Sequence, residues 1–283
     1  MLTVNQLNFN YPNSRLVLNS IDLDFTAGNI YGLFGKNGEG KSTLLKIMTG
    51  LLFPKTGNCT LNGHSTKKRS VESLQHVFLV PEDFELPAIS IGNFEKVQSC
   101  FYPNFSKQQF YELIKEFQLS VTDVISKLSF GQKKKVLIAF GIAANTKLLL
   151  MDEPTNGLDI PSKSQFRRVM ASAVDENKCI VISTHQVRDL HSLINHIVIL
   201  DNGQAVFDQS LNIISNSLWF GKPPSYEESN ILYQESSFGG KAILPRMDMT
   251  ETEVDLELLF NGILSEPSKI KSTLKGTDHG SGV

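Results

Sequence analysis

The stretch IYGLFGKNGEGKS, residues 30–42, decides the fold of this chain. Its first five residues form an apolar run of the kind found in a parallel strand that is buried on both faces. Residues 35–42 match the pattern GxxxxGK(S/T), whose glycines let successive backbone N–H groups turn inward onto phosphate oxygens. Residues 42–48 continue with apolar side chains in a helical pattern. A strand, a glycine-rich loop and a helix in this order predict a loop that binds nucleotide phosphates.

The residues of this loop have predicted roles that follow from phosphate chemistry. The helix that begins near Lys41 directs the positive end of its dipole at the bound phosphates. Lys41 is placed to reach the β- and γ-phosphates, and the Ser42 hydroxyl to ligate Mg²⁺. The residues predicted to contact the nucleotide here are Gly35, Asn37, Gly38, Gly40, Lys41, Ser42 and Thr43.

Apolar runs alternate with helical patterns on both sides of the loop. Residues 76–80, 147–151, 179–183 and 196–200 have the composition of buried strands, and helical periodicity lies between the second and third of these runs. Such alternation predicts βαβ units in a mostly parallel sheet. The fold class predicted is therefore α/β.

Three flanking regions differ from this central pattern. Residues 3–9 and 21–25 alternate apolar and polar side chains, which predicts half-buried strands near the N-terminus. Residues 88–145 are mainly helical, with Phe110, Leu113, Ile114 and Phe117 on one helical face. After about residue 210 the chain becomes richer in Ser, Asn, Pro and Glu. We expect a linker there, a hairpin around Gly-Gly at 239–240, and a short helix.

A strand that ends in two carboxylates follows at residues 148–153. The tip of a strand beside a phosphate loop is where Mg²⁺ needs an anionic partner, and Asp152 fits that position. Glu153 fits a general base that orients and polarises an attacking water. The pair predicts hydrolysis of the bound nucleotide.

Taken together, these motifs resemble those of the ATP-binding cassette (ABC) family, the ATPase subunits of ABC transporters. Residues 35–42 are similar to its Walker A motif and residues 148–153 to its Walker B motif. The sequence LSFGQ at 128–132 resembles the LSGGQ signature and lies 20 residues before the Walker B strand. Asp159 looks like the end of the D-loop, and His185 matches the switch histidine. The resemblance covers about residues 1–210.

The resemblance implies a fold and a division of the chain. The fold is a P-loop NTPase (RecA-like) core with an N-terminal antiparallel β subdomain, a helical subdomain and a small C-terminal extension. The ABC ATPase domain spans residues 1–212, with the helical subdomain at about 88–145. A small α+β accessory segment covers residues 213–264, and residues 265–283 are expected to be a disordered tail.

The resemblance also implies roles for single residues. Ser129, Gly131, Gln132 and Asp159 would bind ATP held by a partner cassette in a head-to-tail dimer. His185 would hydrogen-bond the γ-phosphate, which completes a catalytic set with Glu153 and Lys41. Tyr11 looks like the aromatic residue that stacks on adenine, with Phe9 as the alternative.

Two positions depart from the family pattern. Glu82 stands where the family usually has glutamine after the strand, and Phe130 replaces the first glycine of the signature. Glutamate still offers a hard oxygen donor to Mg²⁺. The predicted metal site is therefore Ser42, Glu82 and Asp152, with Ser42 and Glu82 as ligands and Asp152 as the anionic partner behind them. Because Ser129 and Gly131 remain, we expect the backbone at the start of this helix still to bind the γ-phosphate.

Charge and composition narrow the classes of partner that this protein can have. The net charge of −2 argues against a nucleic-acid partner, and the longest apolar stretch, 136–144, is too short to span a membrane. The first residues lack a signal-peptide pattern, and the three cysteines lack metal or disulfide spacing. We therefore expect a cytoplasmic protein, peripheral on the inner face of the membrane through a separate transmembrane permease subunit.

The predicted function is that of an ATP-binding and ATP-hydrolysing transporter subunit that uses ATP and Mg²⁺. It would dimerise, as a homodimer or with a paired ATPase subunit, and drive the permease, with an exporter favoured over an importer. The loop 82–94, with Phe84, Leu86 and Ile89, is the predicted docking surface, although these side chains could equally pack the subdomain. The alternative is a soluble ABC ATPase of translation or DNA maintenance. A catalytically silent regulatory subunit is disfavoured by Lys41 and Glu153.

Overall fold

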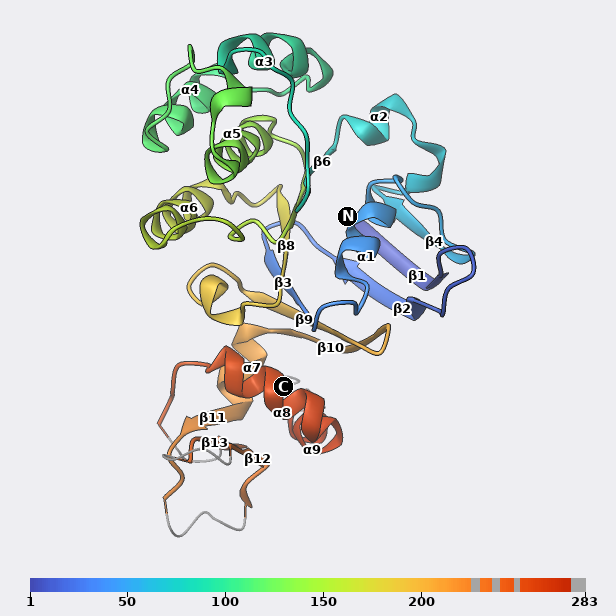
Figure 1. The fold of residues 1–283 in the computed structure, drawn as a ribbon. Coiled ribbons are helices and arrows are strands. Elements are labelled where there is room, and N and C mark those ends of the chain that lie inside the picture. The colour runs from blue at the N-terminus through green and yellow to red at the C-terminus, as the bar shows by residue number, and fades with distance from the viewer. Residues whose placement is uncertain (225–229, 236–239, 247–249, 276–283) are drawn as a thin grey trace.

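The computed structural model describes residues 1–224, 230–235, 240–246 and 250–275 (Figure 1). Its centre is a six-stranded sheet in the order β10-β9-β3-β8-β7-β6, in which only β10 runs antiparallel to its neighbour. The strands are β3 (Ile30–Phe34), β6 (Val77–Val80), β7 (Leu148–Asp152), β8 (Cys179–Thr184), β9 (His196–Asp201) and β10 (Gln204–Ser210).

Both faces of this sheet are covered at its centre, which explains the unbroken apolar runs in strands such as β3 and β7. In β7, Leu149 and Met151 belong to a core shared with α5 (Phe130–Ala143) and α6 (Ile160–Ala173). Leu148 and Leu150 belong to a second core, which α1 (Lys41–Met48) shares. Successive side chains of a strand point to opposite faces, so two covered faces require an unbroken apolar run.

A second, antiparallel sheet covers the far side of α1, as Figure 1 shows. Its order is β2-β1-β4-β5, with β1 at Leu2–Phe9, β2 at Leu18–Phe25, β4 at Thr56–Leu61 and β5 at His64–Ser65. The predicted fold class is confirmed: an α/β P-loop core carries an N-terminal antiparallel subdomain. A 3₁₀ helix, η1 (Thr66–Lys68), and the short α2 (Val71–Leu74) lead from this sheet to β6.

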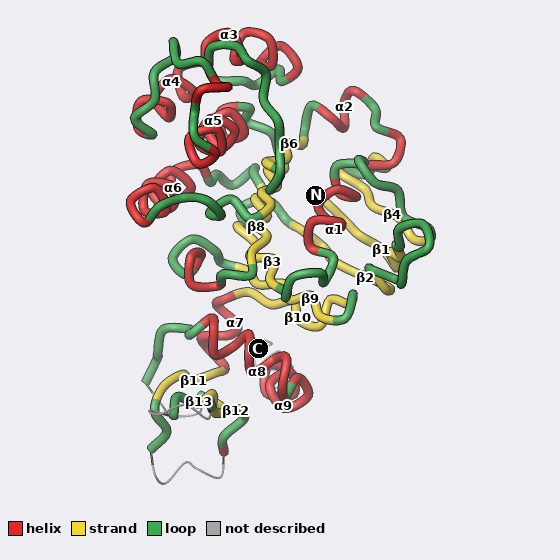
Figure 2. Tube along the Cα trace, viewed as in Figure 1, coloured by secondary structure: helices red, strands yellow, loops and turns green. Residues whose placement is uncertain are grey.

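Helices dominate between β6 and β7, as Figure 2 shows by colour. They are α3 (Ile91–Gln98), η2 (Ser99–Phe101), α4 (Lys107–Glu116), η3 (Ile125–Lys127) and α5. Phe140 of α5 is the centre of their packing, because the rings that meet it come from several elements. These rings belong to Phe78, Phe94, Tyr102, Phe105 and Phe110.

The C-terminal extension folds directly onto the cassette. It contains α7 (Leu211–Ser217), β11 (Leu218–Gly221), β12 (Tyr233–Gln234), β13 (Ala242–Pro245), α8 (Leu256–Ser265) and α9 (Pro267–Lys275). β12 and β13 pair antiparallel as the predicted hairpin requires, although Gly239 of its turn lies outside the described residues. Residues 211–221, partly expected to be a linker, are α7 and β11.

The expectation of a disordered tail from residue 265 is wrong for α9. Ile270 and Leu274 lie four residues apart on this helix, and both are buried in the main core. That apolar pair is enough to hold a short polar helix against the rest of the protein. Residues 276–283 of the predicted tail lie outside the described residues. Across the described ranges, no helix combines the length and apolarity that a membrane crossing needs.

Candidate functional site

Many of the residues predicted from the sequence line one cavity of about 440 Å³; Gly35, Asp152, Ser129, Gly131, Gln132 and Asp159 do not. It lies where β3, β6, β7 and β8 end, because the carboxyl ends of parallel strands share one edge of a sheet. Ten predicted residues and two unpredicted ones, Val17 and Asn156, line it. The predicted ones are Tyr11, Asn37, Gly38, Gly40, Lys41, Ser42, Thr43, Glu82, Glu153 and His185.

Glycines shape the loop between β3 and α1. Gly38 and Gly40 have φ angles of 88° and 94°, in the region that side chains other than glycine rarely adopt. A Cβ on Gly40 would also lie 2.7 Å from Leu18 Cδ2, and one on Gly35 would lie 2.8 Å from the Leu200 carbonyl oxygen. Glycine is therefore favoured by the backbone at positions 38 and 40, and by close packing at positions 35 and 40.

Lys41, the first residue of α1, is almost fully buried. Its Nζ donates hydrogen bonds to the carbonyl oxygens of Gly35 (2.7 Å) and Lys36 (3.1 Å), within the loop itself. Burial lowers the pKa of this ammonium group, while the carboxylates of Glu153 and Asp152 oppose that shift. Lys41 thus brings a largely desolvated ammonium group to the lining of the cavity.

Tyr11 and Phe9 occupy different environments, which separates the two candidates for adenine contact. Phe9 is 6% exposed and packs edge-on against Tyr11, with ring centroids 4.9 Å apart. Tyr11 is 39% exposed, borders the cavity, and lies with its hydroxyl 3.1 Å from Thr43 Oγ1. Phe9 is thus a core residue, and Tyr11 alone of the two faces the cavity.

Glu153 is held by residues at the end of β8. Its Oε2 accepts a hydrogen bond from Thr184 Oγ1 (3.0 Å), and its Oε1 accepts one from the His185 backbone N–H (3.0 Å). The same Oε1 lies 2.8 Å from His185 Nδ1. The Glu153 backbone has a φ of 45°, a strained value for a residue with a side chain. A carboxylate and an imidazole are therefore fixed side by side at the cavity.

The predicted metal ligands are hard oxygen donors, but they do not all border the cavity. Ser42 and Glu82 do; Asp152 is buried beside it, and its Oδ1 accepts a 2.5 Å hydrogen bond from Ser183 Oγ. No cluster of three or more His, Cys, Asp or Glu side chains suited to a metal occurs among the described residues. A few hard donors beside a phosphate site suit Mg²⁺, which keeps waters and shares phosphate oxygens rather than filling an all-protein cage.

The signature residues lie outside the cavity lining. Ser129 caps α5: its Oγ accepts from the Gln132 N–H (3.2 Å), and Gln132 Oε1 accepts from the Ser129 N–H (3.0 Å). A Cβ on Gly131 would lie 2.8 Å from the Gly157 carbonyl oxygen, so α5 begins against the segment that precedes α6. Asp159 caps α6 by accepting from the Ser162 N–H at 2.8 Å. One chain does not bring these residues to its own phosphate loop.

The two departures from the family pattern both make specific contacts. Glu82 Oε1 accepts a hydrogen bond from Asn156 Nδ2 at 3.0 Å. Phe130 is 46% exposed and stacks on Phe84, with ring centroids 5.2 Å apart and the planes inclined by 18°. The loop after β6 is thus attached to the first turn of α5.

Comparison with known proteins agrees with the geometry. Residues 18–156 match the model of the family described as ABC transporter.

This chain belongs to the ABC family.

The ABC relatives include YdbJ, an ABC transporter ATP-binding protein of Bacillus subtilis (strain 168), 29% identical over 70% of this chain and 66% of YdbJ. The lantibiotic transport ATP-binding protein SrtF of Streptococcus pyogenes is 28% identical over 74% of this chain and 90% of SrtF. The alignment with YdbJ thus covers just under two thirds of YdbJ's own length. A solved ATP binding subunit of an ABC transporter has a TM-score of 0.68 at 25% identity, covering 75% of this chain and 91% of that one.

The predicted family is confirmed, and with it an ATP-binding subunit in a family of ATPases. The dimeric ABC cassette MJ0796 has a TM-score of 0.66 at 21% identity, over 75% of this chain and 99% of that one, which supports the fold.

Besides Val17, sequence reasoning missed Asn156 and the burial of Lys134 at this ABC site. Asn156 follows the Walker B carboxylates closely, and its position in that turn was the available signal. Lys134 has no exposed surface, and its Nζ donates to the carbonyl oxygens of Glu153 (3.0 Å) and Asn156 (3.3 Å). A lysine within a run of three lysines looks solvated, so nothing in the sequence indicates that Lys134 is buried.

The side chains predicted to dock the membrane subunit are not among the large exposed apolar side chains of the described residues. Phe84, Leu86 and Ile89 are partly buried against the main core, which favours the packing alternative. Large exposed apolar side chains lie elsewhere. Leu51, Val71 and Phe101 are 53%, 71% and 60% exposed and line a separate cavity of about 420 Å³.

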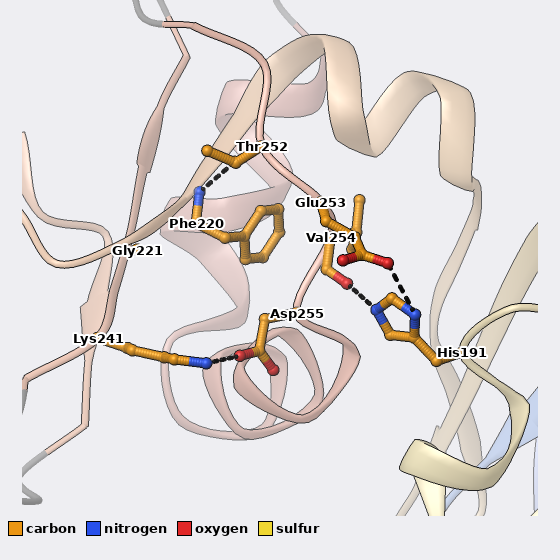
Figure 3. Close-up of a pocket in the computed structure, with 8 residues that line it drawn as sticks. All are labelled: His191, Phe220, Gly221, Lys241, Thr252, Glu253, Val254 and Asp255. Carbon is orange, nitrogen blue, oxygen red and sulfur yellow. Dashed lines mark hydrogen bonds and ion pairs between the residues drawn. The ribbon is translucent and has the colours of Figure 1, made fainter.

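A further cavity of about 410 Å³ lies in the C-terminal extension of this ABC subunit (Figure 3). His191 follows the 3₁₀ helix η4 (Val187–Leu190), which itself follows His185. The His191 ring donates from Nε2 to the Val254 carbonyl oxygen (2.8 Å), and its Nδ1 lies 3.3 Å from Glu253 Oε1. Lys241 and Asp255 pair at 2.7 Å. The two His191 contacts attach the extension to the segment that follows His185, whereas the Lys241–Asp255 pair lies within the extension.

Proposed function

We propose that this protein is the ATP-hydrolysing subunit of an ABC transporter and drives a separate membrane permease. The observation that carries the proposal is the convergence of Lys41, Glu153 and His185 on one cavity beside the phosphate loop. The family supplies ATP as the nucleotide. The alternative of a soluble ATPase in translation or DNA maintenance has no supporting contact or relative among those described above.

We infer that the phosphate loop holds the ATP phosphates with its backbone amides and Lys41. Gly35, Asn37, Gly38, Gly40, Ser42 and Thr43 complete this contact set. The Ser42 hydroxyl and Glu82, backed by Asp152, would hold Mg²⁺. When bound, that ion would neutralise charge on the phosphate oxygens. Tyr11, exposed at the cavity rim, would stack on the adenine.

Glu153 acts in this proposal as the general base for the attacking water. Its carboxylate accepts hydrogen bonds from Thr184 and His185, so its orientation is fixed before a substrate arrives. A positioned base contributes typically 10²- to 10⁴-fold to a reaction rate. His185, beside this carboxylate, would hydrogen-bond the γ-phosphate and hold the water in line.

A dimer completes the site in this proposal. Ser129, Gly131, Gln132 and Asp159 lie outside the cavity of their own chain, so they serve a nucleotide held by a second cassette. A homodimer and a pair with a related ATPase subunit both satisfy this geometry. The solved MJ0796 cassette is described as dimeric, which supports the arrangement.

We further propose export as the direction of transport. A relative described as Nod factor export ATP-binding protein I of Cupriavidus metallidurans aligns with 93% of this chain, extension included, at 26% identity. MetN of Carboxydothermus hydrogenoformans, described as a methionine import protein, is 30% identical but aligns with 73%. The match that includes the extension favours the exporter.

The membrane partner would hold the protein at the inner face of the membrane. The surface that suits it is the apolar cavity of Leu51, Val71 and Phe101, because a contiguous exposed apolar patch marks an interaction site. The matching surface of the permease would then be apolar.

Replacement of Glu153 by Gln tests the catalytic proposal. We expect Glu153→Gln to bind Mg²⁺-ATP normally, to lower the hydrolysis rate at least 100-fold, and to elute as a dimer with ATP. Steady-state phosphate release and size-exclusion chromatography measure these effects. Glu112→Gln on the exposed face of α4 is the matched control and should retain the wild-type rate. An unchanged rate in Glu153→Gln would remove the residue from its role, and a wild-type protein that binds no ATP would overturn the function.

A further inference from the structure

Lys134 is a charged side chain in the interior of the protein. It belongs to the second turn of α5 and has no exposed surface. Burial of an ammonium group costs several kcal/mol unless hydrogen bonds and charges compensate it. The two hydrogen bonds it donates, to the carbonyl oxygens of Glu153 and Asn156, supply part of that compensation.

The turn that receives these bonds carries the site. Glu153 opens it with a left-handed backbone (φ 45°), and such strain persists only where neighbouring contacts fix it. Asn156, near its end, donates from Nδ2 to Glu82 Oε1 (3.0 Å) and accepts at Oδ1 from Gln186 Nε2 (3.3 Å). Lys134 therefore binds the backbone of the turn 153–156. The Asn156 side chain of that turn contacts Glu82 and Gln186, the neighbour of His185.

Charge links Lys134 to the same group of residues. Burial lowers the pKa of the Lys134 ammonium, and nearby carboxylates, Glu82 foremost and then Glu153, act in the opposite direction. Glu82 is the position where a neutral glutamine is usual in the family. The extra negative charge at position 82 thus acts on a positive charge in the protein interior. Asn156 joins the two side chains, because its backbone carbonyl oxygen accepts from Lys134 and its Nδ2 donates to Glu82.

The second departure contacts the same lysine. Lys134 Nζ lies 5.1 Å from the centre of the Phe130 ring, a distance at which a cation is attracted to an aromatic face. Phe130 in turn stacks on Phe84, two residues beyond Glu82. Both unusual residues are therefore connected to Lys134, one by hydrogen bonds through Asn156 and the other by its ring.

We propose that Lys134 is a positioning residue that fixes the turn 153–156 and balances the carboxylate at position 82. Glu82 and Lys134 are then a matched pair, and Glu82 is oriented toward the cavity because Asn156 is held in place. The effect on hydrolysis rests on the proposed function, whereas the pairing itself does not.

A stability cycle tests the pairing without any assay of hydrolysis. We compare the melting temperatures of wild type, Glu82→Gln, Lys134→Met and the double variant. Glu82→Gln should lower the melting temperature of the wild type, because Lys134 loses its balancing charge. It should raise that of Lys134→Met, because an unbalanced carboxylate is removed. Equal shifts in the two backgrounds would overturn the pairing, whether or not the protein hydrolyses ATP.

Kinetics test the positioning role. Lys134→Met should lower kcat at least tenfold while KM for ATP changes less than threefold, since the phosphate loop is untouched. Glu82→Gln added to Lys134→Met should recover kcat at least threefold. Lys133→Met, a partly exposed neighbour on the same turn, is the matched control. A Lys134→Met protein within twofold of the wild-type kcat would overturn the role. A wild type with no hydrolysis would instead refute the proposed function.

Discussion

Glu153 adopts a backbone conformation that costs of order 1–3 kcal/mol for a residue with a side chain. The cost is offset by contacts that also orient its carboxylate, from Thr184, His185 and, through the backbone, Lys134. Strain and orientation at this residue therefore have the same structural source. A substitution that relaxes the turn would also release the carboxylate.

Single residues of the site differ in how far their sequence context reveals them. Lys41 and Ser42 are defined by their positions in a glycine-rich loop, and Glu153 by the end of a strand, so the motif predicts where each of them lies. Lys134 has no such marker, because only the packing of α5 decides that it is buried. Asp152 is predicted from the strand end to act behind the metal ligands, and in the structure it lies outside the cavity lining, with its Oδ1 hydrogen-bonded by Ser183 Oγ.

The three cysteines should react very differently with alkylating reagents. Burial raises the pKa of the Cys59 thiol to about 11 and that of Cys179 to about 12, so both stay protonated near pH 8. The thiolate is the reactive form. Cys100 is exposed and lines the apolar cavity of Leu51, Val71 and Phe101.

Iodoacetamide at pH 8 should therefore modify Cys100 alone in the folded protein, as peptide mass spectrometry would show. Labelling in urea is the control and should modify all three thiols. Equal labelling of Cys59 in the folded protein would contradict its burial.

Helices and strands of the cassette can be predicted from the sequence where the local apolar pattern matches the way the element packs in the fold. β7 is an unbroken apolar run because helices cover both faces of the sheet. α9 was missed for the opposite reason: two apolar residues in a polar stretch do not make a helix until there is a surface to pack on. Phe84 shows the same effect, since its ring is partly covered by a stack with Phe130 that no local pattern signals.

Capping separates a structural role of α5 from a functional one. Ser106 and Ser129 each cap a helix by accepting a hydrogen bond from a backbone N–H, at 3.2 Å in both cases. Ser106→Ala and Ser129→Ala should each lower the free energy of unfolding by about 1 kcal/mol, measured by urea denaturation. Only Ser129→Ala should also lower ATP hydrolysis, because the proposed dimer places it on the partner's nucleotide. Equal hydrolysis rates in the two variants would assign Ser129 a capping role only.

The whole molecule has one main core that includes both the cassette and its extension. Leu190 and Phe207 of the cassette belong to the same buried cluster as Leu259 and Ile270 of the extension. A boundary at residue 212, which the family resemblance implies, therefore crosses a continuous apolar interior. The extension is part of how the cassette is stabilised.

Truncation after residue 212 should consequently destabilise the protein. Each large apolar side chain that is uncovered costs about 1.5–3 kcal/mol, so we expect a melting temperature lowered by more than about 10 °C. Glu112→Gln, an exposed side chain on α4, is the control and should change it by less than about 2 °C. A 1–212 protein as stable as the full chain would contradict the shared core.

The extension follows the cassette in the sequence, and this order affects how the protein is made. Every residue proposed to contact the nucleotide, from Tyr11 to His185, leaves the ribosome before α7 does. Translation proceeds at about 5–20 residues per second, so the roughly 65 residues from the start of α7 to the end of α9 take several seconds. During that interval the apolar surface that includes Leu190 and Phe207 lacks the side chains of α8 and α9 that belong to the same core. The nascent cassette is therefore most prone to aggregate before α8 and α9 emerge.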